Sequence, residues 1–171
     1  GLTVLKPASV FSAEANAALE IGLIGCGGRG SWIADLFAQS GKYRLVACAD
    51  YFQDKTDKVG DKHKVPAGRR YTGLSGYKRL LESKLDAVVI ETPPYFHPQQ
   101  AMDAAAAGKH VYVAKPVAVD VPGCLQIEAA GKSATGKKRC FLVDYQLPTD
   151  PAAIDAVKRL AEPGFGQIAR V

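Results

Sequence analysis

The sequence lacks long hydrophobic runs, clustered cysteines and internal repeats. No apolar run approaches the roughly 18–20 residues of a membrane span, so we expect no transmembrane helix. The cysteines form no C-x-x-C pair and have no companion histidine cluster, so we expect no metal site. Free cysteines in apolar, strand-like runs, as at Cys48 and Cys140, behave as small hydrophobic residues. We therefore expect buried structural thiols that do not fix the redox compartment at Cys26, Cys48, Cys124 and Cys140.

Composition and charge are those of an ordinary globular domain. With 171 residues, 47% of them hydrophobic and 23% charged, the chain is long enough for one domain with its own core. This excludes a disordered tail, a collagen-like fibre and a disulfide miniprotein. The 22 Lys and Arg residues outnumber the 17 Asp and Glu residues, but the longest basic cluster is only residues 137–139. We expect no nucleic-acid partner, although the net charge of +5 favours an anionic ligand.

From residue 19 onward, short apolar runs alternate with helical patterns. The predicted strands are residues 19–24, 43–49, 86–91, 110–113 and 140–143. The predicted helices are residues 29–39, 53–60, 77–84, 99–107, 122–132 and a last one that Asp150 caps and Gly164 ends. A loop rich in Lys, Pro and Gly follows residue 60, and a new strand is expected from residue 166. This alternation predicts an α/β fold with right-handed crossovers and a doubly wound parallel sheet.

A glycine-rich turn joins the first predicted strand to the first predicted helix. Its sequence fits G-x-G-x-x-G and reads Gly25-Cys26-Gly27-Gly28-Arg29-Gly30. Gly25 would permit the tight turn, Gly27 the close approach of a pyrophosphate, and Gly30 the close packing of helix on strand. The helix N-terminus adds free N–H groups and a partial positive charge. We therefore predict a dinucleotide site at these four glycines and Arg29.

Asp50 closes the second predicted strand, where dinucleotide-binding folds place an acidic residue. A carboxylate there accepts hydrogen bonds from both hydroxyls of the adenosine ribose and repels a 2′-phosphate, so it favours NAD over NADP. Two alternatives stay open. Asp50 caps the following helix, or the domain uses a similar turn to bind FAD or S-adenosylmethionine.

Two further loops follow strands at the same sheet edge, where ligands of open parallel sheets bind. One is Glu91-Thr92-Pro93-Pro94-Tyr95-Phe96-His97, and the other is Val113-Ala114-Lys115-Pro116. Prolines stiffen both loops, and Lys115 is placed to present its ammonium group to a bound substrate.

Together these segments resemble the Gfo/Idh/MocA family of oxidoreductases, named for glucose–fructose oxidoreductase and inositol dehydrogenase. The resemblance rests on GCGGRG, Asp50, TPPYFH at 92–97, AGKHVYVAKP at 107–116 and FLVDYQ at 141–146. It implies a Rossmann domain followed by a second α/β domain, which is absent from this chain. It also implies hydride transfer between a nicotinamide cofactor and a polyhydroxylated substrate such as a sugar or an inositol.

The resemblance assigns roles by position. It implies that Gly25, Gly27 and Gly30 hold the pyrophosphate and Asp50 the ribose, while Thr92, Pro93 and His97 line the nicotinamide side. Lys115 matches the catalytic lysine of the family's Glu-Lys-Pro motif, and Gln146 lies at the cofactor edge. For His97, a structural role in its loop is the alternative to ligand contact. The glutamate of the motif is Ala114 here, so its carboxylate is missing or supplied elsewhere.

The same resemblance divides the chain. We expect residues 1–18 to be a leader or linker, residues 19–163 the dinucleotide-binding domain, and residues 164–171 the start of the second domain. The general acid/base residues would lie beyond Val171, so this chain alone would bind NAD and turn over little. The full-length form is expected to be a homo-oligomer. Small-x-small patterns in residues 13–17, and a leader like those following twin-arginine signals, favour export to the periplasm, with the cytoplasm as the alternative.

Two other functions remain open. One is a non-catalytic protein that binds the cofactor in a Rossmann domain, which Ala114 supports. The other is an enzyme that cleaves glycosides by transient oxidation and elimination with NAD.

Overall fold

The computed structural model describes residues 18–162, Gly164 and Gly166. Six parallel strands form one sheet in the order β3-β2-β1-β4-β5-β6. The chain builds the sheet outward from β1 in one direction, then crosses back and continues from β4 in the other. This arrangement confirms the predicted doubly wound α/β fold, and it opens a crevice where the strand order reverses.

The elements agree closely with the sequence pattern. The strands are β1 (Leu19–Ile24), β2 (Tyr43–Asp50), β3 (Arg70–Thr72), β4 (Ala87–Ile90), β5 (His110–Ala114) and β6 (Phe141–Asp144). The helices are α2 (Gly28–Gln39), α3 (Gln53–His63), α4 (Gly76–Glu82), α5 (His97–Ala106), α6 (Val121–Gly136) and α7 (Pro151–Leu160). Two short 3-10 turns are η1 (Ala67–Arg69) and η2 (Leu147–Thr149).

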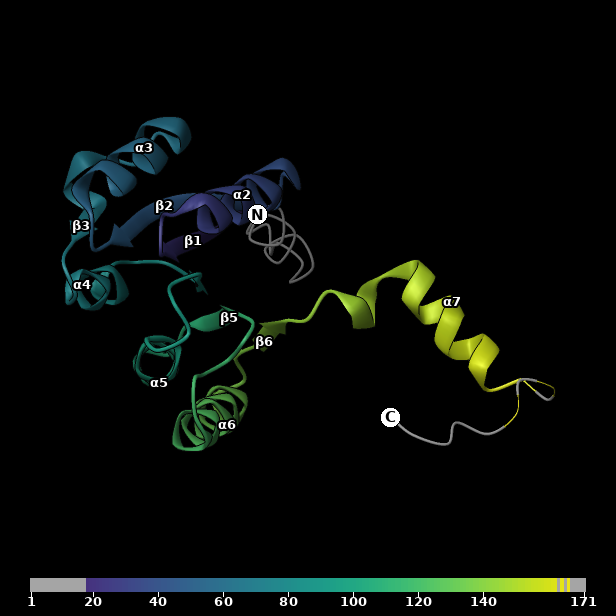
Figure 1. Ribbon diagram of the computed structural model, residues 1–171. Coiled ribbons are helices and arrows are strands. Elements are labelled where there is room, and N and C mark those ends of the chain that lie inside the picture. Colours follow the sequence, from purple (N-terminus) through teal and green to yellow (C-terminus); the bar gives the residue numbers. More distant parts are fainter. Residues whose placement is uncertain (1–17, 163, 165, 167–171) are drawn as a thin grey trace, which may run out of the picture.

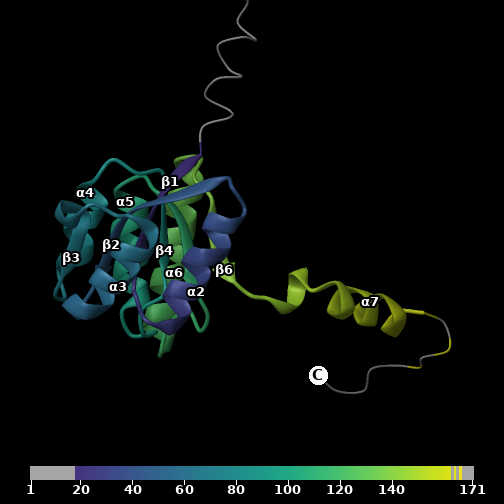
Figure 2. The same ribbon diagram turned by 90° about the horizontal axis from the view of Figure 1, so that it is seen from above.

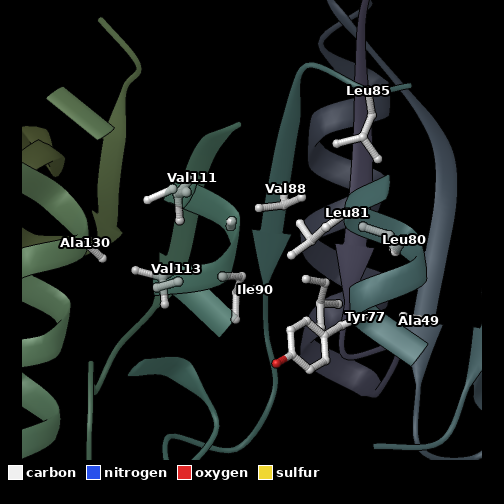
Figure 3. Close-up of a cluster of buried hydrophobic side chains, with 14 of the residues drawn as sticks. Ala49, Tyr77, Leu80, Leu81, Leu85, Val88, Ile90, Val111, Val113 and Ala130 are labelled. Atoms are coloured by element: carbon white, nitrogen blue, oxygen red, sulfur yellow. The ribbon is translucent and has the colours of Figure 1, made fainter. Parts of the chain in front are cut away.

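Helices cover both faces of the sheet (Figure 1). On one face, Ile33 of α2 and Val59 of α3 pack into a buried cluster with strand residues such as Leu23. On the other face, α4, α5 and α6 form the larger cluster, part of which is shown in Figure 3. Because both faces are covered, the central strands are hydrophobic on both sides, as their continuous apolar runs predict.

Helix α7 lies away from the sheet in both views (Figures 1 and 2). It begins as predicted, because the Asp150 carboxylate accepts a hydrogen bond from the Ala153 N–H at 2.9 Å. Its apolar residues Ile154, Val157 and Leu160 are all exposed. In the part of the chain that the structure describes, no helix is long and apolar enough to cross a membrane.

Several sequence-based expectations need correction. The loop expected after residue 60 contains the edge strand β3, which pairs with β2. His63 is the last residue of α3 rather than part of a loop. Cys26 and Cys48 are buried as expected, but Cys124 and Cys140 are exposed, because α6 turns one side to solvent and Cys140 precedes β6. The leader patterns at 13–17 and the strand expected from residue 166 fall largely outside the described residues.

Candidate functional site

A cavity of about 850 Å³ lies at the carboxyl edge of the sheet. It is next to the neighbouring strands β1 and β4, between which the strand order reverses. Its floor is the glycine-rich turn, and its walls come from the ends of β2 and β4 and from the loops that follow β3 and β4. The lining residues are Ile24, Gly25, Gly27, Gly28, Arg29, Gly30, Ala49, Asp50, Tyr51, Phe52, Lys55, Gly73, Leu74, Tyr77, Glu91, Thr92, Pro93, Phe96 and Gln100.

Two glycines of the turn are required by close backbone contacts. Gly25 has a φ of +96°, and a Cβ atom there would lie 2.6 Å from the carbonyl carbon of Glu91. A Cβ on Gly30 would lie 1.9 Å from the Gly25 carbonyl oxygen. Because that oxygen belongs to the backbone, no side-chain movement can relieve this overlap. Side chains at these positions would push α2 off the sheet.

The other two glycines leave space on the cavity side. A Cβ on Gly27 or Gly28 would meet nothing within 4 Å. Gly27 is the N-cap of α2, has no side-chain cap, and the first turn carries no acidic residue. The N-terminal N–H groups of α2 are therefore free to bind an anion, and the glycines let its oxygens approach the backbone.

Asp50 connects the end of β2 to this turn. Its Oδ2 accepts a hydrogen bond from the Cys26 N–H at 2.7 Å, and its Oδ1 accepts one from the Phe52 N–H at 3.0 Å. The N-cap of α3 is Phe52, so Asp50 does not cap that helix. Each carboxylate oxygen retains a second acceptor position, and Asp50 lines the cavity.

An apolar rim borders the cavity next to Asp50. Tyr51 and Phe52 are exposed, and their rings lie 5.0 Å apart in an edge-to-face arrangement. Leu74, from the loop after β3, is 66% exposed and lines the same cavity. This rim can cover a flat, apolar ring, whereas the glycine-rich turn suits an anion.

The loop after β4 contributes polar groups. The Thr92 hydroxyl donates to Oε1 of Gln100 at 2.6 Å, and both residues line the cavity. Gln100 is buried on α5, so this bond fixes the amide at the cavity wall.

His97 joins two loops. Its Nε2 lies 2.6 Å from the Thr92 carbonyl oxygen and its Nδ1 lies 3.0 Å from the Pro116 carbonyl oxygen. The side chain is buried and is not part of the cavity lining. Burial lowers the pKa of His97, while the two carbonyl contacts act in the opposite direction. In this position the ring connects the loop after β4 to the loop after β5.

A cluster of charged side chains includes Arg29 in the first turn of α2. The Arg29 guanidinium pairs with the Asp144 carboxylate at the end of β6, and its Nε lies 3.1 Å from Glu91 Oε2. The Glu91 side chain is fully buried, and neither carboxylate oxygen has a hydrogen-bond partner among the described residues. Burial raises the pKa of Glu91 to about 7, although the Arg29 charge opposes this shift.

Strand register aligns this cluster with Ala114. Ala114 on β5 pairs with Asp144 on β6. On the other side Val113 pairs with Ile90, so Glu91 follows β4 at the same level. Two carboxylates therefore flank the position at which the sequence has alanine.

Comparison with known proteins gives the relationship directly. Residues 19–145 match the family model described as an oxidoreductase family with an NAD-binding Rossmann fold. The chain belongs to the Gfo/Idh/MocA oxidoreductase family. The matched segment runs from the start of β1 to the residue after β6, so it contains the whole cavity.

Curated relatives within the family carry glycosidase names. An alpha-N-acetylgalactosaminidase from Shewanella oneidensis is 31% identical over 131 residues, which is 74% of this chain and 28% of that protein. A glycosyl hydrolase family 109 protein from Solibacter usitatus is 30% identical over 147 residues, 81% of this chain and 33% of its own length. The chain therefore spans about a third or less of these relatives.

Solved structures show the same fold. An NAD-binding oxidoreductase from Klebsiella pneumoniae is 29% identical, with a TM-score of 0.69 over 85% of this chain and 39% of that one. A 3-ketoreductase from Actinomadura kijaniata, solved with NADP, has a TM-score of 0.70 at 24% identity, covering 88% of this chain and 46% of that one. The fold is thus that of the N-terminal domain in larger Gfo/Idh/MocA structures.

The structure brings most of the predicted site residues together. The turn glycines, Arg29, Asp50, Thr92 and Pro93 all line the cavity. His97, Lys115 and Gln146 do not; Lys115 and Gln146 are exposed, after β5 and β6 respectively. Contact of these three residues with a ligand stays a prediction for the Gfo/Idh/MocA site.

Sequence reasoning missed several lining residues. These are Tyr51, Phe52, Leu74, Tyr77 and Gln100, whereas Glu91 and Phe96 belong to a loop that was placed at this edge but were given no role. The sequence pattern Tyr51-Phe52, directly after the predicted ribose-binding acid, could have indicated the rim. Two large aromatic residues next to a predicted ligand site often contact the ligand. In the described range 18–162, no cluster of three or more His, Cys, Asp or Glu residues is arranged to hold a metal ion.

Proposed function

We propose that this chain is the nucleotide-binding part of an NAD-dependent enzyme that oxidises or reduces a carbon of a sugar, inositol or related polyol. One observation carries the proposal: a single cavity contains both the uncapped N-terminus of α2 at Gly27 and the carboxylate of Asp50. A volume of about 850 Å³ lies within the range of small-molecule sites.

The residues present fit a dinucleotide. Gly27 and Gly28 leave the N–H groups of α2 accessible to a pyrophosphate, and Arg29 adds a positive charge beside them. Asp50 has acceptor positions for two ribose hydroxyls, and the rim formed by Tyr51, Phe52 and Leu74 suits an adenine ring. When bound, the nicotinamide ring of NAD supplies a hydride acceptor, or a donor in its reduced form.

Lys115 would act on the substrate side. It follows β5 at the same sheet edge as the cavity, and its side chain is exposed. An ammonium group near the reacting oxygen stabilises negative charge as a hydroxyl loses its proton.

The preference for NAD over NADP rests on Asp50. Its negative charge, fixed by two backbone N–H groups, would repel a 2′-phosphate at the ribose. Lys55 also lines the cavity, but its ammonium lies 3.5 Å from Asp54, which offsets its charge.

A second candidate function follows from the relatives named as glycosidases. Such an enzyme would use the same domain for transient oxidation of a sugar carbon, followed by elimination of the aglycone. Incubating the full-length protein with an aryl glycoside and with the free sugar separates the two. Aryl alcohol release without net NADH accumulation supports the glycosidase, and NADH accumulation on the free sugar supports the dehydrogenase.

Cofactor binding tests the proposal directly. Trp32, the only tryptophan, lies on α2 with the Arg29 guanidinium 5.6 Å from its ring centre. Titrating the chain with NADH and NADPH should quench Trp32 and sensitise NADH emission, with the tighter binding for NADH. Absence of binding by either would contradict the proposal, and tighter NADPH binding would contradict the role of Asp50.

A further inference from the structure

Glu91 is the least satisfied charged group that the structure describes at the cavity. Its side chain is fully buried, both carboxylate oxygens lack hydrogen-bond partners among the described residues, and the residue lines the cavity. Neither a glycine-rich turn nor a ribose-binding acid needs such a group. Among the described residues, the ion pair with Arg29 is the only close charge that offsets the cost of burying this carboxylate, so its protonation is favoured.

The charged and titratable groups that face Glu91 come from three elements. Arg29 of α2 lies 3.1 Å away, Asp144 at the end of β6 pairs with the same Arg29, and Tyr112 on β5 interacts with both carboxylates. Burial and Asp144 raise the pKa of Tyr112, so this phenol stays neutral. With Glu91 ionised the cluster carries one net negative charge; with Glu91 protonated it is neutral.

Arg29 connects this cluster to the cavity. Its side chain is 37% exposed, it lines the cavity, and it belongs to the first turn of α2, beside the proposed pyrophosphate position. A guanidinium shared between two carboxylates has little charge left for a phosphate. One that pairs with Asp144 alone is a stronger phosphate ligand.

We propose that Glu91 is a proton-linked positioning residue: it takes up a proton when the dinucleotide binds, which frees the charge of Arg29 for the diphosphate. This proposal rests on the proposed function of the cavity. The proton comes from solvent and ends on a Glu91 oxygen, so no covalent bond to the cofactor forms. By linkage, the diphosphate raises the proton affinity of Glu91, and protonated Glu91 strengthens diphosphate binding by the same factor.

The raised pKa of Glu91 determines how NADH affinity should change with pH. Its pKa is already raised to about 7 by burial, so the free protein loses this proton around neutral pH. Affinity for NADH should therefore be highest below that point and fall as pH rises through it. The steepest loss permitted by one proton is about tenfold per pH unit.

The test combines calorimetry with a matched pair of variants. NADH is the probe, because the 2′-phosphate of NADPH itself titrates near pH 6. Titrations in buffers of different ionisation enthalpy, at about pH 7.5, should show uptake of up to about one proton per NADH bound by the wild-type chain. Glu91→Gln should abolish most of this uptake and bind NADH with nearly constant affinity from about pH 6 to about pH 8.5.

Glu128→Gln, which removes an exposed acid on α6, should retain the wild-type uptake and pH profile. Wild-type binding without proton uptake would overturn the coupling while leaving the proposed function intact, and it requires no variant to fold. Equal uptake by wild type and Glu91→Gln would also overturn it. Failure to bind NADH at every pH would overturn both proposals.

Discussion

The Asp50 carboxylate accepts a hydrogen bond from the Cys26 backbone N–H at 2.7 Å, which links the end of β2 to the glycine-rich turn after β1. Asp50 thereby has two functions. It fixes the position of the turn, and it places a negative charge at one end of the cavity. Substitutions of Asp50 should therefore change both stability and cofactor preference.

Asp50→Asn should shift the preference from NADH toward NADPH by about tenfold, because the amide no longer repels a 2′-phosphate. The variant should lose about 2 kcal/mol in stability, because the amide oxygen keeps one N–H bond as a neutral one and the amide NH2 cannot accept the other. Competitive titration of Trp32 fluorescence measures the first effect and urea unfolding the second. Asp54→Asn, at an exposed position on α3, is the matched control, and an unchanged NADH/NADPH ratio in Asp50→Asn would refute the assignment.

Two glycine substitutions should separate folding from binding. Gly30→Ala introduces a methyl group 1.9 Å from the Gly25 oxygen and should cost about 3 kcal/mol or more in stability. Gly27→Ala meets nothing within 4 Å, so stability should change by only about 0.5 kcal/mol, while NADH affinity falls by about tenfold or more. Urea denaturation and NADH titration report the two quantities. Normal NADH binding by Gly27→Ala would contradict a pyrophosphate at this turn.

Glu91→Gln should remove a pH dependence of stability. The folded-state pKa of about 7 lies above the ordinary 4.5, so the folded protein holds this proton more tightly than the unfolded chain. The contribution of Glu91 to the free energy of unfolding is fully present below pH 4.5, and it is lost as pH rises through 7. As pH rises from about 4.5 to about 8, the free energy of unfolding of Glu91→Gln should increase by on the order of 3 kcal/mol relative to that of the wild type. Parallel curves in urea unfolding would show that the Glu91 pKa is not raised.

Sequence patterns predicted the main features of the fold because they are local. The strand from Leu19 to Ile24, the turn after it and the acid at Asp50 each have a short-range pattern with a physical reason. β3 was missed because Arg70, Tyr71 and Thr72 show no alternation, and only pairing with β2 makes them a strand.

The charge cluster could not be predicted for a related reason. Arg29 and Asp144 are 115 residues apart in the chain, and only the order of β1, β4, β5 and β6 brings them together. Similarly, the pattern around His97 does not show that its ring contacts main-chain oxygens of two loops. Such relationships depend on strand order and register rather than on local sequence.

His97→Ala should destabilise the domain by about 2–3 kcal/mol, because the ring N–H that donates to the Thr92 or Pro116 carbonyl oxygen is lost and a buried side chain is removed. Urea denaturation measures the loss, with Gln99→Ala on the exposed side of α5 as control. If His97 instead contacts the cofactor, His97→Ala will weaken NADH binding while leaving stability close to that of the control.

Lys115→Ala, made in the full-length protein, should lower turnover by about a hundredfold or more. NADH affinity should change by less than about twofold, since Lys115 lies outside the cavity lining. Steady-state kinetics and NADH titration provide the two readings, with Lys78→Ala on the exposed side of α4 as control. Unchanged turnover would refute a catalytic role for Lys115.

A crystal structure of the chain soaked with NADH tests the central claim most directly, because it places each part of the cofactor. The account predicts the pyrophosphate over Gly27 and Gly28 at the start of α2, with the adenosine ribose hydroxyls on Asp50. Density for NADH elsewhere on the surface, or an unchanged cavity at saturating NADH, would contradict it.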